Sequence, residues 1–500
     1  MATSMTAAES DALKRRARLS MIALGLRSLG QNVITLVSNV YLARLLTPAD
    51  YGIVSILQFA MSVLRLVGDA GLAAALIQRS EAPEERALSS LFWLQLGIGL
   101  VLVACASIVA PYIRLIWPAL PESASWLLRG LSLSLLFTLL RSVPFLVLER
   151  NVRFGLIGAL EFFGTLGFHV TAVVLALRGA GAASLVTAAV VQSGLISAAA
   201  IIAQRYRPRF VFDWQAIRGL LRFGVAFQGT NAVNFINGTL APLLVGAYLG
   251  PNALGLVEFA QNTAWFPTNI VGIIRRVTFP YLSRIQHDKQ AFAREFERIV
   301  TLSAIPIYLF MGLFLGAAPL IVRVVYSAKW LPAIPALYVY SLVISINFFS
   351  WIGGAALEAL GATGRMFRLI VVATTINCVA CVVAVWWSPT PLSFALGFSV
   401  HMLVNSSAIY WALRDLVPSK PLSGIAALVV AGATVAVVGR GLQPYLHGVL
   451  GVVVWGVVGT ATYAGVALLC DRRLRALAAG LIRERWGAKP AGSSKPQHDA

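Results

Sequence analysis

Apolar runs of close to twenty residues recur along this chain of 500 residues, from Leu19 to Cys470. Wound as an α-helix at about 1.5 Å per residue, such a run crosses the roughly 30 Å hydrocarbon core of a bilayer. Lipid cannot satisfy backbone N–H and C=O groups, so the runs must be helices, because the alternation typical of barrel strands is absent. The sequence therefore predicts an all-α polytopic membrane protein.

The spacing of the runs predicts about fourteen transmembrane helices. Two of the expected spans are 253–280 and 299–325. Composition agrees, since only 12% of the residues are charged, against about a quarter in soluble domains. The loops between the runs are too short for a catalytic domain. No phosphate-binding loop, nucleophile elbow or metal-ligand spacing occurs, so we expect no enzyme activity, no catalytic residues, no cofactor and no metal.

The net charge of +20 does not predict a nucleic-acid partner, because the basic residues punctuate the gaps between the runs and form no single surface. With the N-terminus placed in the cytoplasm, most Lys and Arg residues fall on the inner side, and both termini are then cytoplasmic. The basic, Gly/Ser/Pro-rich tail 471–500 is expected to be disordered and near anionic membrane lipid.

An internal repeat organises the spans. Leu46-x-Pro48-x3-Gly52-x-Val54-x3-Gln58 recurs at an offset of 203 as Leu249-x-Pro251-x3-Gly255-x-Val257-x3-Gln261. Parallel repeats of this kind predict two pseudo-symmetric six-helix lobes with a substrate path between them. The expected segments are an N-terminal tail 1–18, an N-lobe 19–203, a cytoplasmic linker 204–219, a C-lobe 220–413, and two further helices in 422–470.

Polar residues at membrane depth are costly and need a reason. Arg27 and Gln31 belong to a polar stripe on the first predicted helix, and Gln228, Asn231 and Asn234 follow one face of the seventh, with Gln31 and Asn234 equivalent in the repeat. Such stripes fit a hydrated cavity that hydrogen-bonds hydroxyl-rich cargo. They also fit hydrogen bonds that join neighbouring helices. Together the matched stripes favour the cavity.

Charged residues in the spans suggest an anion site. Arg65, Arg141 and Arg27 could bind a phosphate bidentately, although Arg65 and Asp69, one turn apart, could also neutralise each other. Asp69, Glu161 and Glu258 are candidates for coupling to a proton, since burial favours a protonated carboxyl. Glu161 could equally lie at the inner interface.

Several segments resemble the polysaccharide transporter family, the Wzx-type oligosaccharide flippases of the multidrug/oligosaccharidyl-lipid/polysaccharide exporter superfamily. They are SNVYLARLLTPADYG (38–52), GDAGLAAALIQR (68–79), LGPNALG (249–255), FPYLSR (279–284) and KWLP (329–332). The resemblance covers nearly the whole chain from the first to the twelfth predicted helix.

The resemblance implies a two-lobed bundle in a bacterial inner membrane that moves undecaprenyl-pyrophosphate-linked oligosaccharide between leaflets, alongside polysaccharide polymerase and export machinery. Arginines would then contact the pyrophosphate and amides the sugars. The first predicted helix has no carboxylate, unlike that of the superfamily's drug exporters. A multidrug or lipid II exporter remains an alternative, and a membrane glycan polymerase is a weaker one because the external loops are short and nearly uncharged.

Overall fold

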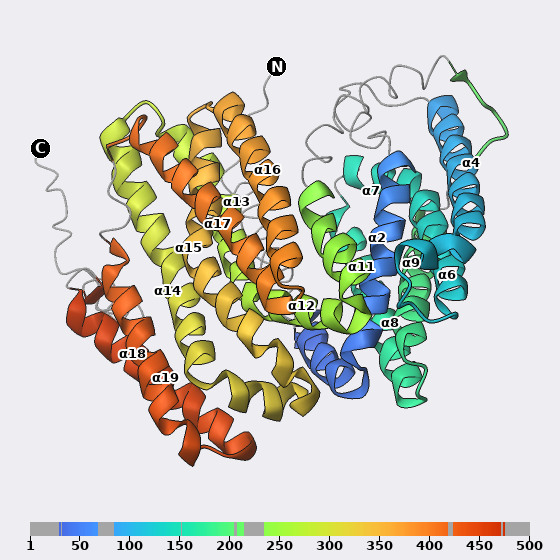
Figure 1. Ribbon diagram of the computed structural model, residues 1–500. Helices are drawn as coiled ribbons and strands as arrows, with labels where there is room; N and C mark the ends of the chain where they lie inside the picture. Colours follow the sequence, from blue (N-terminus) through green and yellow to red (C-terminus); the bar gives the residue numbers. More distant parts are fainter. Residues whose placement is uncertain are drawn as a thin grey trace, which may run out of the picture. The chain divides into compact units, whose positions relative to one another are not determined.

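The computed structural model describes residues 30–31, 33–68, 85–151, 153–204, 208–214, 235–418, 424–471 and 474–475. The elements in these ranges are helices (Figure 1). Eleven of them are long and apolar enough to cross a membrane, so the prediction of an all-helical polytopic protein is confirmed. Two shorter apolar helices, Val33–Leu45 and Phe235–Tyr248, are also described.

The eleven long spans follow the predicted runs. Their elements are α2 (Pro48–Gly68), α4 (Glu85–Val109) with the short α5 (Ile113–Ile116), α6 (Ala124–Leu140) with α7 (Ser142–Arg150), α8 (Phe154–Leu177), α9 (Ala182–Gln204), α14 (Lys289–Ile321), α15 (Ile334–Ala359), α16 (Thr363–Trp387), α17 (Pro391–Arg414), α18 (Ala426–Leu442) and α19 (Gly448–Cys470).

Two predicted spans differ from the structure. The span predicted at 253–280 is divided into α12 (Gly250–Trp265) and α13 (Thr268–Arg284), because Pro267 has no N–H to continue the hydrogen-bond ladder. The span predicted at 299–325 begins earlier, at Lys289. Hydropathy finds only the apolar part of such a helix, whereas its polar first turns are stabilised by the side chain of Asp288, which accepts hydrogen bonds from the Gln290 and Ala291 N–H groups.

Contacts within the chain separate it into two compact units. Unit 1 comprises Met1–Phe259, Tyr326–Ala333 and Thr374–Phe398, and unit 2 comprises Ala260–Val325, Ile334–Ala373 and Ser399–Ala500. Each unit therefore contains segments that are distant in sequence. The lobe boundaries expected from the repeat stay a prediction.

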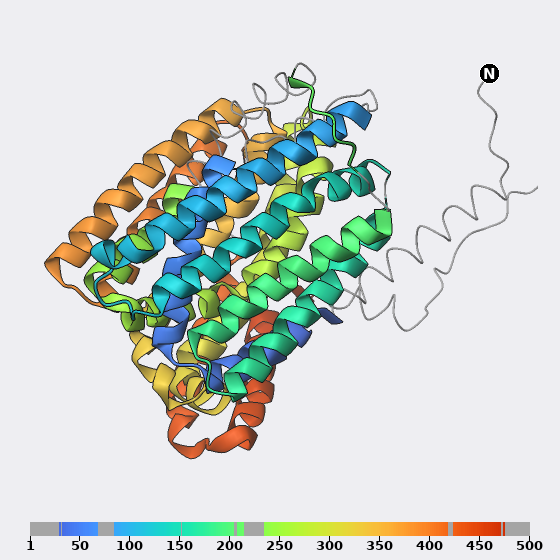
Figure 2. The same ribbon diagram turned by 90° about the vertical axis from the view of Figure 1, so that its right-hand side faces the viewer.

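In unit 1, α4, α6, α8 and α9 run side by side (Figure 2), with α6 packed against both α4 and α9 and α8 packed along α9. Small residues permit the last of these contacts: a side chain at Gly164 or Gly167 of α8 would collide with Ile196 or Leu195 of α9. Close backbone approach through small residues is the usual basis of helix packing in lipid. This bundle carries Arg141 and Glu161, two of the five predicted site residues that the structure describes.

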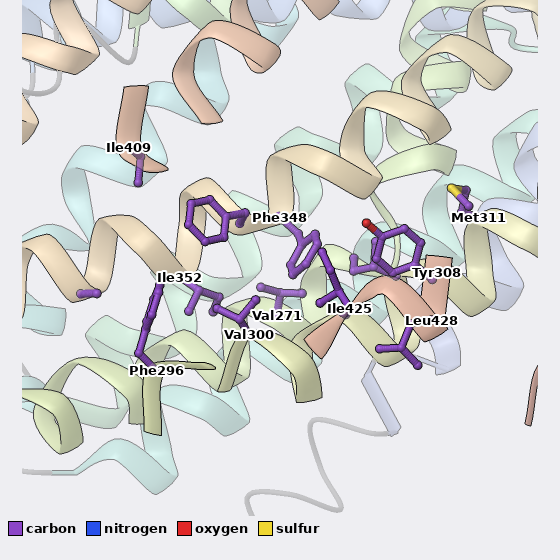
Figure 3. Close-up of a cluster of buried hydrophobic side chains, with 14 of the residues drawn as sticks. Val271, Phe296, Val300, Tyr308, Met311, Phe348, Ile352, Ile409, Ile425 and Leu428 are labelled. Carbon is purple, nitrogen blue, oxygen red and sulfur yellow. The ribbon is translucent and has the colours of Figure 1, made fainter. Parts of the chain in front are cut away.

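Unit 2 has a large apolar core. Val271, Phe296, Val300, Phe348 and Ile352 lie together in it, from α13, α14 and α15 (Figure 3). The helices α18 and α19 pack closely against α14 through glycines. The buried ring of Trp455 lies against Gly316 and Gly439, and its Nε1 donates to the Leu313 carbonyl at 3.0 Å. These two C-terminal helices are thus an integral part of unit 2.

Candidate functional site

Half of the predicted site residues lie in described parts of the chain: Gln31, Arg65, Arg141, Glu161 and Glu258, all in unit 1. The other half lie outside the described residues: Arg27, Asp69, Gln228, Asn231 and Asn234. The site geometry below therefore concerns the first group and its neighbours.

Three charged residues of unit 1 interact electrostatically. Arg65 lies in the last turn of α2, Arg141 separates α6 from α7, and Glu161 lies on α8. The charges of both Glu161 and Arg65 act on the guanidinium of Arg141, and α2 packs on α6 while α7 packs on α8. We call Arg65, Arg141 and Glu161 the charged cluster. The first two were predicted as anion ligands and the third as a coupling group, and in the structure Arg65 and Glu161 both act electrostatically on Arg141.

The local backbone explains how Arg141 is presented. It ends α6 and begins α7, with its N–H bonded to the Phe137 carbonyl and its carbonyl accepting from Phe145 N–H. The guanidinium lies 5.0 Å from the centre of the Phe145 ring, a cation–π contact that orients the charge. Arg141 is half-buried, whereas Arg65 and Glu161 are exposed on the surface of the unit.

The charged cluster carries two positive charges and one negative charge on helices that span the membrane. Two arginines can bind the oxygens of a phosphate or diphosphate in bidentate fashion, and a low-dielectric surrounding strengthens that attraction. The carboxylate of Glu161 balances part of the positive charge when no anion is bound. Chemically, the cluster is suited to bind an anion reversibly.

The amide of Gln31 is used in helix packing. Its Nε2 donates to Thr165 Oγ1 of α8 at 3.1 Å, and one turn later Thr35 Oγ1 and His169 Nε2 are 3.3 Å apart. The polar stripe of the helix Val33–Leu45 and the residues just before it thus face α8. Of the two interpretations of the stripe, these contacts match the hydrogen bonding between helices.

A similar arrangement ties Phe235–Tyr248 to α16. Asn237 Nδ2 donates to Thr374 Oγ1 at 2.8 Å, and Asn377 Nδ2 donates to Asn237 Oδ1 at 2.9 Å. The thiol of Cys381 completes the network by donating to Asn377 Oδ1. Gln31 with Thr165 and Asn237 with Thr374 are amide–threonine pairs of nearly the same sequence separation. Sequence analysis identified the amide of Gln31 but had no means of finding its partner.

Glu258 lies where α12 meets α2. Its Oε1 accepts a hydrogen bond from Ser55 Oγ at 3.1 Å, and these residues are separated by the same offset of 203 that relates the two motifs. In the same contact a Cβ on Gly52 would overlap the Pro251 carbonyl, and a Cβ on Gly255 would overlap that of Pro48. We call this contact between the two motifs the helix crossing.

Two buried tryptophans flank the helix crossing. Trp330 Nε1 donates to the Ala43 carbonyl at 2.8 Å, and Trp117 Nε1 donates to the Pro242 carbonyl at 2.9 Å. Ala43 lies in the helix Val33–Leu45, before the first copy of the motif, and Pro242 lies in Phe235–Tyr248, before the second copy. Each indole N–H thus binds a carbonyl of the helix that precedes one copy. Neither tryptophan was predicted, because nothing in its local sequence indicates a distant carbonyl partner.

No group of His, Cys, Asp and Glu residues that could hold a metal ion occurs in the part of the chain that the structure describes. The arrangement instead consists of the charged cluster and a close, reciprocal contact between two helices. Neither contains a nucleophile activated by a base.

Known proteins that resemble this chain take part in polysaccharide biosynthesis. A family described as "Polysaccharide biosynthesis protein" matches residues 41–335. The chain is 27% identical over 482 residues to the succinoglycan biosynthesis transport protein ExoT of Rhizobium meliloti, covering 91% of this chain and 93% of ExoT. It is 26% identical over 307 residues to the teichuronic acid biosynthesis protein TuaB of Bacillus subtilis, covering 61% of this chain and 63% of TuaB.

Among solved structures, the fold is similar to that of the lipid II flippase MurJ in its inward closed conformation. The TM-score is 0.76 at 15% sequence identity, and the match covers 91% of this chain and 99% of MurJ. At that identity the likeness shows the fold. The chain is therefore a multi-pass membrane protein of the polysaccharide biosynthesis protein family, a Wzx-like family of transporters, not enzymes.

Proposed function

We propose that this protein is a flippase that moves undecaprenyl-pyrophosphate-linked oligosaccharide repeat units across the bacterial inner membrane, for exopolysaccharide, capsule or O-antigen synthesis. The observation that carries the proposal is the charged cluster, in which Arg65 and Arg141 lie within each other's electrostatic reach on membrane-spanning helices. A diphosphate joined to a lipid is the anion that such a site would meet at this depth.

The remaining predicted residues have roles in the same proposal. Arg27 would join the two arginines of the charged cluster, and Gln228, Asn231 and Asn234 would contact sugars. One N–H of the Gln31 amide is engaged by Thr165, so Gln31 would contact a glycan through its other N–H or its amide oxygen. Asp69, Glu161 and Glu258 are proposed to couple transport to an ion.

The transport cycle is proposed to be alternating access of two six-helix lobes, with two further helices and fourteen in all, both termini being cytoplasmic. The helix crossing supports this cycle, because its contacts are made by the two copies of the repeated motif. Alternating access requires such a contact on one side of the membrane to open while the other side closes. Polysaccharide polymerase and export machinery are the proposed partners.

The test is leaflet-resolved tracking of a lipid-linked oligosaccharide in vesicles that contain the purified protein. Arg65→Ala and Arg141→Ala are expected to reduce the rate of translocation strongly. The matched control is Arg129→Ala, an arginine on α6 whose guanidinium stacks on Trp126, away from the charged cluster. Wild-type rates for both cluster variants would remove these arginines from the site.

Deletion of the gene separates the alternatives. Loss of an exopolysaccharide alone is expected for a glycan flippase. Lethality would instead indicate a lipid II exporter, drug sensitivity a multidrug exporter, and accumulation of translocated but unpolymerised units a glycan polymerase.

A further inference from the structure

Residues 208–214, which lie in the predicted linker, are bound to the first turns of α4 by their backbone; we call them the strap. Arg209 N–H donates to Ser89 Oγ at 3.2 Å, and Asp213 N–H donates to Ser90 Oγ at 2.7 Å. Trp93 Nε1 donates to the Arg209 carbonyl at 2.8 Å. Figure 1 shows the strap beside the upper end of α4. Side chains of one helix thus satisfy the backbone of an extended segment that has no ladder of its own.

Side-chain contacts add to this attachment. Arg209 Nη2 lies 2.8 Å from Glu85 Oε2, and the rings of Phe210 and Trp93 are stacked with centres 4.8 Å apart. Because both the backbone and Arg209 are held, the strap cannot turn over to bury its other side chains. Its aromatic residues stay on the outside of unit 1.

Those aromatic residues are unusually exposed. Phe210 is 90% exposed, Phe212 56% and Trp214 54%. Three large aromatic side chains on one short segment form an apolar patch of the kind that marks a contact surface. Within the strap the charge of Arg209 is balanced by that of Asp213, and Arg209 also pairs with Glu85.

The length of α4 places the strap in the membrane. The helix α4 has 25 residues, or about 37 Å at 1.5 Å per residue, which is longer than the roughly 30 Å hydrocarbon core and shorter than the roughly 40–45 Å of a bilayer with its headgroup layers. The first turns of α4 therefore lie at the level of the headgroups. The strap is bound to Glu85, Ser89 and Trp93 in those turns, so it lies at the same level.

We propose that the strap is a membrane anchor whose aromatic side chains insert into the headgroup layer at the end of the bilayer where α4 begins. Aromatic rings with an adjacent arginine are the side chains that favour this layer. The anchor holds the chain that follows α9 at the membrane surface and fixes it to unit 1. Its partner is the lipid surface, and the anchor is independent of the cargo.

Fluorescence quenching tests the anchor in the full chain. In a background in which Cys105, Cys378, Cys381 and Cys470 are replaced by alanine, Phe210→Cys or Phe212→Cys carries a bimane label in phosphatidylcholine–phosphatidylglycerol vesicles. Brominated lipid is expected to quench both labels, and access of aqueous iodide is expected to be lost. Two labelled positions guard against a substitution that disturbs the strap.

Two further positions calibrate the measurement. Glu122→Cys, on an exposed loop with 91% of the glutamate side chain accessible, should be quenched by iodide. Val437→Cys, exposed on the membrane-spanning α18, should be quenched by brominated lipid. Iodide quenching of the strap labels at the level of the Glu122 position would overturn the anchor. So would shielding from both quenchers, which would show that protein covers the patch.

Discussion

Gly52 of α2 and Gly255 of α12 make the same contact in opposite directions: Gly52 lies against the carbonyl of Pro251, and Gly255 lies against that of Pro48. Both glycines occupy the same position of the repeated motif. A contact in which each partner offers the same surface is the intramolecular counterpart of a two-fold interface. The repeat therefore has a physical reason, because each copy of the motif supplies one proline and one glycine to the helix crossing.

Alanine at Gly52 or at Gly255 is expected to weaken the helix crossing to a similar extent. The added Cβ would overlap a backbone carbonyl, which cannot rotate away as a side chain can, and overpacking of this kind costs about 1–3 kcal/mol. Thermal unfolding of the purified variants should show comparable losses for both, and transport should fall with them.

Gly97→Ala is the matched control, because Gly97 lies within the membrane-spanning α4 and has open space where a Cβ would be. It should leave thermal unfolding nearly unchanged. Tolerance of alanine at one motif glycine and not at the other would contradict the reciprocal geometry.

The hydrogen bond between Ser55 and Glu258 predicts coupling between these residues. Ser55→Ala and Glu258→Gln should each alter stability, and the double variant should lose less than the two losses added together. Residues in direct contact show coupling energies of about 0.5–3 kcal/mol, whereas distant ones add. A double-mutant cycle on the unfolding free energy measures this, and strict additivity would show that the bond contributes nothing.

The fold and the site were open to sequence analysis to different degrees. The helices were predictable because length and hydropathy are local properties, and so was the importance of Pro48, Gly52, Pro251 and Gly255, because they repeat. The break at Pro267 is also local, but the apolar residues on both sides of it concealed two helices within one run.

Contacts between residues that are distant in the sequence were not predictable. The sequence shows that Gln31 carries an amide on a polar stripe, but not that Thr165 of α8 accepts its hydrogen bond. A stripe that lines a cavity and a stripe that joins two helices have the same period. Arg65, Arg141 and Glu161 were each identified separately from their cost in the membrane, and only the packing of their helices brings them together.

The first turn of α14 should depend on the side-chain oxygen of Asp288, which lies outside the membrane span. The N–H groups of Ala291 and Gln290 hold the pKa of Asp288 below its usual range. A lowered pKa means that the cap stabilises the folded state above the unfolded value of about 3.9 and loses this effect as the pH falls through the folded value. Hydrogen exchange at neutral pH should show a frayed first turn in Asp288→Ala and a protected one in Asp288→Asn. Equal protection in both would show that the cap has no role.

Trp455 should be essential for the attachment of α18 and α19 to α14. It is 1% exposed and fills the space left by Gly316 and Gly439. Trp455→Ala is expected to cost about 3–5 kcal/mol, as truncation of a buried aromatic residue does. Trp386→Ala, at a residue that is 82% exposed, should cost far less. Equal unfolding temperatures for the two variants would contradict a role of Trp455 in packing α19 against α14.

Removing the carboxylate of the charged cluster should strengthen its attraction for anions. Glu161 is the negative charge that acts on Arg141, so Glu161→Gln leaves two arginines without it. Binding of a polyprenyl pyrophosphate should then tighten by a few-fold, roughly 1 kcal/mol for one charge at partly exposed distance. Turnover should slow, because an anion that is held more tightly is released more slowly.

Arg141→Lys should weaken binding, since lysine lacks the planar fork that pairs with phosphate and stacks on Phe145. Equilibrium binding measured with single-turnover translocation separates these effects. Glu122→Gln, in a loop outside the cluster, is the control, and looser binding in Glu161→Gln would mean that this carboxylate positions the arginines instead of competing with the anion.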